Sequence, residues 1–362
     1  MTLPLVNDAF ETLKPYEPGK PVSETERELG LSGVVKLASN ENPLGPSPKA
    51  LEAVRAHIET LHDYPDAGAF HLKRKLAEFH DVSPEHIVVG NGTNEILEML
   101  IRTVLRDGEN VVYADPSFVV YKLCTLSAGR DLRSVPLKDM RYDLPAMADA
   151  VDAKTKLVFL ANPNNPTGTY VTQDEFNGFL AAIPDDVLVV MDEAYTEYVD
   201  APDYPDAFAT LGKRERYMIS RTFSKCYGLA GLRIGYGIAN PELVNYLNRG
   251  RQPFNTNSLA QVAAIAALDD QEHVKNTVEL NRREMTRVVP ELERRGLRVT
   301  PSQANFVLAD AGRDGQALFN ALLRAGVIVR PMTGYGLPTS IRITLGTEAM
   351  NNALLRALDE VL

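Results

Sequence analysis

Short apolar runs rich in β-branched residues recur through the middle of the chain, and segments with helical periodicity separate them. The runs that predict strands cover residues 86–89, 110–113, 156–160, 187–191 and 216–220. Strands that alternate with helices are typical of a mostly parallel sheet with helices on both faces. The pattern therefore predicts a large α/β domain.

The pattern changes after about Val244, where long helical segments replace the alternation. Residues 258–268 form an apolar helical run and 274–295 a highly charged one, while 304–308 and 340–345 predict two further strands. We expect a smaller α+β domain at this end, packed against the first. The expected boundaries are 1–45 for an amino-terminal arm that joins the small domain, 46–250 for the large domain and 251–362 for the small domain.

Each predicted strand of the large domain is followed by polar or glycine-rich residues. In open α/β sheets, ligands bind beyond the carboxyl ends of the strands. Five such strand ends therefore predict one binding site. The segments are 90–94, 115–118, 162–168, 192–195 and 222–225.

The last of these segments places Lys225 beside the hydroxyl residues Thr222 and Ser224, with Arg233 a glycine-rich step further on. A lysine that forms a Schiff base needs a shielded pocket, and an arginine with two hydroxyls can bind a phosphate. An aldehyde that also carries a phosphate indicates pyridoxal 5'-phosphate. We expect this cofactor at Lys225.

Asp192 ends a run that reads as a buried strand. A buried carboxylate is costly unless it is paired, and the protonated pyridine nitrogen of the cofactor is a suitable partner. Tyr195 and Asn165 could reach the phenolic oxygen of the same ring. Taken alone, Asp192 could equally cap a helix or form a salt bridge.

Glycine and proline segments provide weaker signals. Residues 90–95 open a helical pattern, and amides at a helix start bind phosphate, although most such turns only redirect the chain. This segment lacks the Lys-Ser/Thr of a P-loop and the third glycine of a dinucleotide-binding loop. Residues 164–168 predict a rigid turn with a cis peptide bond before Pro166. Phe118 could stack on a cofactor ring or lie in the core.

Composition excludes several other functions. The chain has 362 residues and a formal charge of -10, which disfavours nonspecific nucleic-acid binding. No apolar stretch approaches the roughly 20 residues of a membrane helix, and no secretory signal is visible, so we expect a cytoplasmic protein. Metalloprotease histidine spacing and a GxSxG motif are absent from the sequence, and its two cysteines have no metal-ligand spacing. We expect no metal.

As a set, these residues resemble the fold-type I, pyridoxal-phosphate-dependent aminotransferases, most closely the histidinol-phosphate aminotransferase family. The resemblance covers nearly the whole chain. It is more specific for fold and cofactor than for substrate, because aromatic aminotransferases share much of it. The segments that carry it are 16–20, 37–45, 64–66, 165–168, 192–195, 222–233 and 341–343.

The resemblance implies a role for each site residue. Lys225 holds the cofactor covalently and moves a proton between the substrate α-carbon and the C4' carbon of the cofactor. Tyr64 reaches the cofactor phosphate of a neighbouring subunit, which implies a homodimer with shared sites. Phe118 stands where many relatives have tyrosine over the ring. The other implied roles are Asp192 at the ring nitrogen, Tyr195 and Asn165 at the phenolic oxygen, Thr222, Ser224, Arg233 and the amides of Thr93 and Asn94 at the phosphate, and Tyr16, Asn305, Arg330 and Arg342 at the substrate.

By the same resemblance, we expect transamination of L-histidinol phosphate with 2-oxoglutarate in histidine biosynthesis, which gives imidazole-acetol phosphate and L-glutamate. An aromatic amino acid aminotransferase is the alternative within the same chemistry. A decarboxylase related to threonine-phosphate decarboxylase is an alternative of another reaction class. Because arginine can bind a phosphate or a carboxylate, the motifs do not separate these functions.

Overall fold

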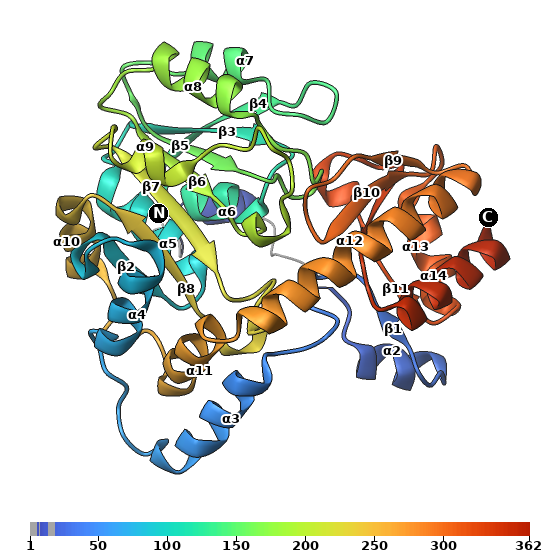
Figure 1. The fold of residues 1–362 in the computed structure, drawn as a ribbon. Coiled ribbons are helices and arrows are strands. Elements are labelled where there is room, and N and C mark those ends of the chain that lie inside the picture. The colour runs from blue at the N-terminus through green and yellow to red at the C-terminus, as the bar shows by residue number, and fades with distance from the viewer. Residues whose placement is uncertain (1–5, 7, 14–18) are drawn as a thin grey trace.

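A seven-stranded sheet forms the centre of the larger part of the molecule (Figure 1). The computed structural model describes residues 6, 8–13 and 19–362. The strand order is β2-β8-β7-β6-β5-β3-β4, and only β8 runs antiparallel to its neighbours. The other six strands therefore end at one edge. The bounds are β2 (Ile87–Gly90), β3 (Asn110–Asp115), β4 (Asp131–Pro136), β5 (Thr155–Ala161), β6 (Leu188–Asp192), β7 (Tyr217–Thr222) and β8 (Gly235–Ala239).

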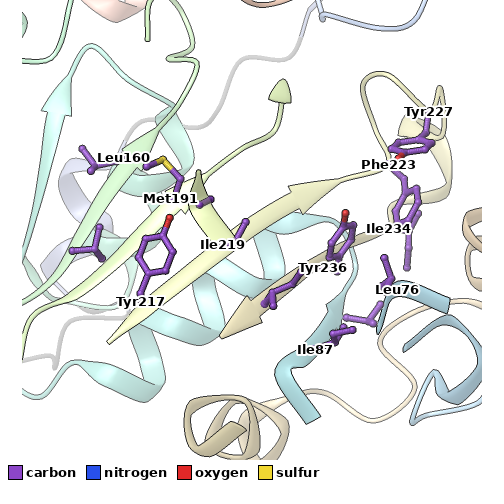
Figure 2. Close-up of a cluster of buried hydrophobic side chains, with 14 of the residues drawn as sticks. Leu76, Ile87, Leu160, Met191, Tyr217, Ile219, Phe223, Tyr227, Ile234 and Tyr236 are labelled. Atoms are coloured by element: carbon purple, nitrogen blue, oxygen red, sulfur yellow. The ribbon is translucent and has the colours of Figure 1, made fainter. Parts of the chain in front are cut away.

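Alternating side chains of this sheet form two apolar layers. On β7, Tyr217 and Ile219 belong to one layer and Met218 to the other, as expected for strand geometry. Figure 2 shows Tyr217 and Ile219 in the first layer together with Phe223 and Tyr236. The helices of this layer are α3 (Pro48–His57), α4 (Phe70–His80), α7 (Leu144–Asp149), α8 (Gln173–Ala182), α9 (Ala207–Leu211) and α11 (Ser258–Leu268), whereas α5 (Thr93–Val104), α6 (Val119–Ser127) and α10 (Pro241–Gly250) cover the other face.

The five strands predicted for the large sheet match β2, β3, β5, β6 and β7 within two residues at each end. Two further strands of this sheet, β4 and β8, were not predicted. In β4, only Val135 is buried, so the run lacks an apolar signature. Gly235 and Gly237 interrupt the apolar run of β8, and a Cβ on Gly237 would lie 1.8 Å from the Met218 side chain. Close packing therefore requires glycine where strand propensity is low.

The smaller part contains an antiparallel four-stranded sheet in the order β12-β13-β10-β9. A separate parallel pair joins β1 (Val35–Lys36) to β11 (Val327–Ile328), and this pairing brings the amino-terminal segment to the small sheet. The long helix α12 (Gln271–Arg294) runs between the two parts (Figure 1). The remaining elements are α1 (Asp8–Thr12), α2 (Val22–Leu29), α13 (Gly315–Arg324), α14 (Glu348–Val361), β9 (Arg298–Thr300), β10 (Phe306–Asp310), β12 (Arg330–Pro331), β13 (Ser340–Thr344) and the 3-10 helices η1 (Ile58–Thr60), η2 (Pro84–His86), η3 (Thr196–Tyr198), η4 (Ala230–Leu232) and η5 (Thr333–Tyr335).

None of the helices in the described part of the chain has both the length and the apolar character that crossing a bilayer requires.

Candidate active site

A cavity of about 360 Å³ lies at the edge where the strands of the large sheet end. Residues of the small sheet and of the amino-terminal segment complete its wall. Most side chains predicted from the sequence meet here. The predicted residues that line it are Thr93, Asn94, Phe118, Asn165, Asp192, Tyr195, Thr222, Ser224, Lys225, Arg233, Arg330 and Arg342, and Gly19, Ala38, Ser39, Asn40 and Tyr335 are among the others.

Lys225 enters the cavity from the loop that follows β7. Its Nζ donates to the backbone oxygen of Ser39 at 3.1 Å and lies 5.8 Å from the ring centroid of Tyr195. Burial, together with the nearby cations Arg342 and Arg233, lowers the pKa of Lys225 to about 7. A large fraction of this amine is therefore neutral, and hence nucleophilic, near neutral pH.

A glycine fixes the turn that carries Lys225. Gly228 has a φ of 70°, and a Cβ at this position would lie 2.2 Å from the backbone oxygen of Gly45. Both the left-handed conformation and the close approach of two backbones favour glycine here.

Asp192 ends β6 and is buried. Its Oδ2 accepts a hydrogen bond from the Tyr121 hydroxyl at 2.7 Å, whereas Oδ1 has no hydrogen-bond partner among the described residues. Burial raises the pKa of Asp192 to about 6, although the Tyr121 hydrogen bond opposes the rise. A buried carboxylate oxygen without a donor is costly, so this site is suited to a ligand that brings a cationic N–H group.

Tyr121 was not singled out by the sequence analysis. It lies in α6, is fully buried, and stacks on Phe159 with ring centroids 4.5 Å apart. Phe118 caps the same helix and meets Tyr121 edge-on at 5.6 Å. Because residues three apart lie on one helix face, the spacing between Phe118 and Tyr121 was the available signal.

The start of α5 and the loop after β7 form a seat for an anion. Arg233 Nη1 lies 3.4 Å from Ser224 Oγ, and a Cβ on Gly92 would lie 2.4 Å from Arg233 Nη2. Thr93 begins α5, and its backbone nitrogen would lie 2.7 Å from a Cβ on Gly235. The two glycines therefore let an arginine and helix amides approach one point, which is the arrangement that binds phosphate.

Arg342 links the small sheet to the loops of the large one. Its Nη1 donates to Asn165 Oδ1 at 2.5 Å and its Nη2 to the backbone oxygen of Ala38 at 2.7 Å. Asn40 donates to the Tyr195 hydroxyl at 2.9 Å, and burial raises the pKa of Tyr195 to about 12. Asn40 has a φ of 55°, a conformation that asparagine tolerates better than most residues, and sequence reasoning had not selected it as a site residue.

Two predicted residues do not line the described cavity, and a third cannot be compared with it. Asn305 is buried and donates to the backbone oxygen of Asn40 at 3.1 Å, and it does not line the described cavity. Tyr64 is 82% exposed, stacks on Phe254 at 4.6 Å, and is likewise absent from the described cavity wall. Tyr16 lies outside the described residues.

The cis peptide bond predicted before Pro166 is wrong. The cis bonds of the described chain precede Pro116 and Pro163. Two Asn-Pro steps lie three residues apart at 162–163 and 165–166, and the tertiary amide makes a cis bond accessible at either step, so the sequence does not select one. The predicted turn nevertheless occurs, because Gly168 N donates to the Asn164 backbone oxygen at 2.7 Å.

Comparison with known proteins adds the family. The model of "Aminotransferase class I and II" matches residues 32–358. A histidinol-phosphate aminotransferase of Anaeromyxobacter sp. (strain Fw109-5) is 51% identical over 99% of this chain and 100% of its own, and one of Moorella thermoacetica is 47% identical over 100% and 94%. Each of these alignments covers nearly the whole of both chains.

Two solved structures extend the comparison. The chain is similar to histidinol-phosphate aminotransferase from Sinorhizobium meliloti in complex with pyridoxal-5'-phosphate, with a TM-score of 0.91 and 30% identity over 99% of this chain and 98% of that one. It also shares the fold of L-threonine-O-3-phosphate decarboxylase from Porphyromonas gingivalis, with a TM-score of 0.81 and 23% identity over 91% and 99%. At that identity the second likeness concerns the fold alone.

Proposed function

Because the chain belongs to the class I and II aminotransferase family, we propose that it transfers the amino group of L-histidinol phosphate to 2-oxoglutarate with pyridoxal 5'-phosphate as cofactor. Imidazole-acetol phosphate and L-glutamate are the products, and the reaction belongs to histidine biosynthesis. The observation that carries the substrate assignment is the full-length similarity to histidinol-phosphate aminotransferases at about half identity.

The cavity fits this cofactor at two separate points. The unpartnered Oδ1 of Asp192 is suited to a protonated ring nitrogen, and the anion seat around Arg233 is suited to the phosphate. When bound, the cofactor supplies an aldehyde that attaches the amino group and a ring that withdraws electrons. The residues that would hold it are Asp192, Asn165, Tyr195 and Phe118 around the ring, and Thr222, Ser224, Arg233 and the amides of Thr93 and Asn94 at the phosphate.

Lys225 would act as the base of the reaction. With its lowered pKa, Nζ can take a proton from the substrate α-carbon and return it, which a lysine with an ordinary pKa does poorly near neutral pH. Asp192 would hold the positive charge at the ring nitrogen, and the hydrogen bond from Tyr121 keeps its carboxylate oriented and ionised. Both groups are therefore prepared before a substrate enters.

Arg330 and Arg342 would bind the anionic groups of the substrates. They lie directly opposite each other on the antiparallel strands β12 and β13, and like charges so placed are destabilising. An anion between them relieves that repulsion. In this proposal Arg342 binds an anionic group of each substrate in turn, whereas Arg330 adds a contact to the phosphate of histidinol phosphate. Asn305 would support this wall through its hydrogen bond to the backbone of Asn40, and its contact with the substrate stays a prediction.

We further propose a homodimer in which Tyr64 serves the site of the partner. Its exposure and its position outside the cavity wall of its own subunit support this arrangement. In every mixed dimer of one Lys225→Ala chain and one Tyr64→Phe chain, both lesions would fall in one site and the other site would be intact. Activity above the mean of the two parents is the expected result. If Tyr64→Phe alone is clearly impaired, no gain after verified subunit exchange would assign Tyr64 to its own subunit.

Donor specificity tests the substrate proposal. We expect kcat/KM for histidinol phosphate, with 2-oxoglutarate as acceptor, to exceed that for phenylalanine by at least about tenfold, because a charge-assisted contact contributes about 1.5–3 kcal/mol. Glutamate formation should accompany each turnover. A preference for phenylalanine would replace the proposal with an aromatic aminotransferase, and carbon dioxide release with an amino acid would replace it with a decarboxylase.

A further inference from the structure

A buried ion pair lies at the same edge of the large sheet as the cavity but does not line it. Arg221 donates through Nε and Nη2 to Glu193 Oε2 at 2.9 and 2.7 Å. The Glu193 side chain is 1% exposed and that of Arg221 is 16% exposed. We call these two residues the Glu193–Arg221 pair. The proposed reaction assigns no step to it.

Each member of the pair is the direct chain neighbour of a residue that faces the cavity. Glu193 follows Asp192, and Arg221 precedes Thr222. Successive side chains of a strand point to opposite faces, so the pair lies behind the two cavity residues. The Arg221 guanidinium also lies over the ring of Phe208, 5.1 Å from its centroid. Phe208 is a residue of α9 and packs against the apolar layer that α9 helps to form.

A tyrosine extends the pair to a third strand. The Tyr204 hydroxyl lies 3.4 Å from Glu193 Oε1 and donates to the backbone oxygen of Asn162, the residue that follows β5. The last backbone hydrogen bonds between these three strands lie beside the same residues. Asn162 N donates to Asp192 O at 2.9 Å, and Glu193 N donates to Ser220 O at 2.8 Å. Side chains therefore continue the connection of β5, β6 and β7 where the backbone ladder ends.

Stability alone gives a weak reason for such a pair. The cost of removing two charges from water often equals or exceeds their attraction, so apolar residues of similar size can replace a buried ion pair without loss. Charged partners that hydrogen-bond at fixed points instead define one relative position of the elements that carry them. The elements here carry Asp192 on β6 and Thr222 on β7.

We propose that the Glu193–Arg221 pair, with Tyr204, is a positioning element that fixes the distance between Asp192 and the phosphate seat at Thr222. This inference rests on the proposed function, since that distance matters only if one rigid cofactor spans both points. The pair contacts no substrate and takes no part in proton transfer.

Arg221 also offsets the charge of Glu193, which lies beside Asp192. The neighbouring Glu193 contributes to the raised pKa of Asp192, after burial as the main cause. Burial raises the pKa of Glu193 as well, and the guanidinium of Arg221 opposes this rise. An ionised Glu193 that is neutralised by Arg221 adds little net charge beside Asp192, which must stay ionised to bind a cationic ring.

Three single variants, the double variant Glu193→Gln/Arg221→Met and one control separate positioning from simple stabilisation. Glu193→Gln keeps the size of the side chain, Arg221→Met removes the cation, and Arg221→Lys keeps the charge but loses the two-point contact. Arg214→Met is the control, because Arg214 is also buried, bonds Asp185, and lies before the opposite end of β7. Each protein is measured for the Kd of pyridoxal 5'-phosphate, for kcat and KM separately, and for Tm without cofactor.

Arg221→Met should raise the cofactor Kd roughly tenfold or more and lower kcat about 10- to 100-fold, since a misplacement of 1 Å can cost about 100-fold. KM for histidinol phosphate should change less than about twofold, because substrate contacts lie on the small sheet. Glu193→Gln should act in the same direction, and the double variant should lose less than the product of the two single losses. Arg214→Met should lower Tm and leave cofactor Kd and kcat near wild type.

The inference is overturned if Arg221→Met and Glu193→Gln lower only Tm, as the control does, or if KM rises while kcat and cofactor Kd stay unchanged. If Arg221→Met does not fold, Arg221→Lys decides by the same criteria, with an expected rise of a few fold in cofactor Kd. Failure of the proposed function looks different, because the wild-type protein itself would then neither bind pyridoxal 5'-phosphate nor transaminate histidinol phosphate.

Discussion

The two walls of the cavity are built in different ways. On the large sheet, Asp192 and Thr222 end adjacent parallel strands, and the backbone ladder joins these strands as far as the pair Asp192–Ser220. On the small sheet, Arg342 reaches the cavity from β13 and is held by hydrogen bonds to Asn165 and to the backbone of Ala38. One wall is held by the backbone ladder and, in our proposal, by the buried Glu193–Arg221 pair. The other is held by side-chain contacts that another acceptor can replace.

This difference matches the two kinds of ligand in the proposed reaction. A cofactor remains through every turnover and benefits from a rigid wall, whereas two substrates enter in turn and need a wall whose contacts can be exchanged. We therefore expect lesions in the large sheet to affect the chemical step and lesions in the small sheet to affect substrate affinity.

The strongest test of the rigid wall is Lys225→Ala. It removes both the covalent attachment and the base, so we expect kcat to fall on the order of 10⁴-fold. Cofactor attachment is measured by borohydride reduction and peptide mapping, which should label Lys225 in the wild type. Lys275→Ala is the control, since that side chain is 73% exposed. A reduced label on another lysine would contradict the assignment.

Asp192→Asn should have the next largest effect. The substitution keeps the size of the side chain but removes the charge that balances a protonated ring nitrogen, so we expect kcat to fall about 10²- to 10³-fold. KM should change much less, because the substituted group faces the cofactor. The measurement is steady-state kinetics on cofactor-loaded protein with an unchanged circular-dichroism spectrum. Near-normal turnover of that protein would exclude this role for Asp192.

The two walls also differ in how far the sequence predicts them. The strands that carry Asp192 and Thr222 are short runs that begin with apolar residues and end with polar ones, so the pattern predicts both the sheet and its functional edge. The hydrophobic pattern also predicts the strand on which Arg342 lies. The hydrogen bond from Arg342 to Asn165, however, joins residues that are 177 positions apart in the chain. Alternation shows which face of a strand an arginine occupies and does not show which loop lies opposite.

The two strands of the large sheet that the sequence missed both lack a continuous apolar run. The strand β4 is mostly exposed, and β8 contains the glycines that close packing requires. Tyr121 resembles an ordinary core aromatic within a helix, and only its hydroxyl contact with Asp192 distinguishes it. Such residues act through tertiary proximity. Periodicity shows which face of a helix Tyr121 shares with Phe118, but it does not show which residue lies opposite that face.

Arg342→Ala tests the exchangeable wall. Loss of a charge-assisted contact costs about 1.5–3 kcal/mol of binding free energy. We therefore expect kcat/KM to fall roughly 10- to 100-fold for histidinol phosphate and for 2-oxoglutarate alike, mainly because KM rises. Arg324→Ala, at an exposed position of α13, is the control.

Arg330→Ala should reduce kcat/KM for histidinol phosphate more than for phenylalanine. An equal loss with both donors would remove the phosphate contact from this proposal.

The smallest expected effect concerns the protonation state of the Lys225 amine in the wall of the large sheet. In the folded protein its pKa is lowered from 10.5 to about 7, whereas the unfolded chain keeps the ordinary value. Below pH 7 both states are protonated and the full cost of burying the cation is present. Between pH 7 and 10.5 the unfolded state binds more protons, so the free energy of unfolding rises with pH by about 1.4 kcal/mol per pH unit from this group. Lys225→Met removes the cost. The cofactor-free variant should therefore have the higher Tm at pH 7.5. Its advantage in the free energy of unfolding should be smaller by about 2 kcal/mol at pH 9. Lys275→Met should show no such trend. A Tm difference that stays constant between these pH values would show that the folded protein does not hold Lys225 with a lowered pKa.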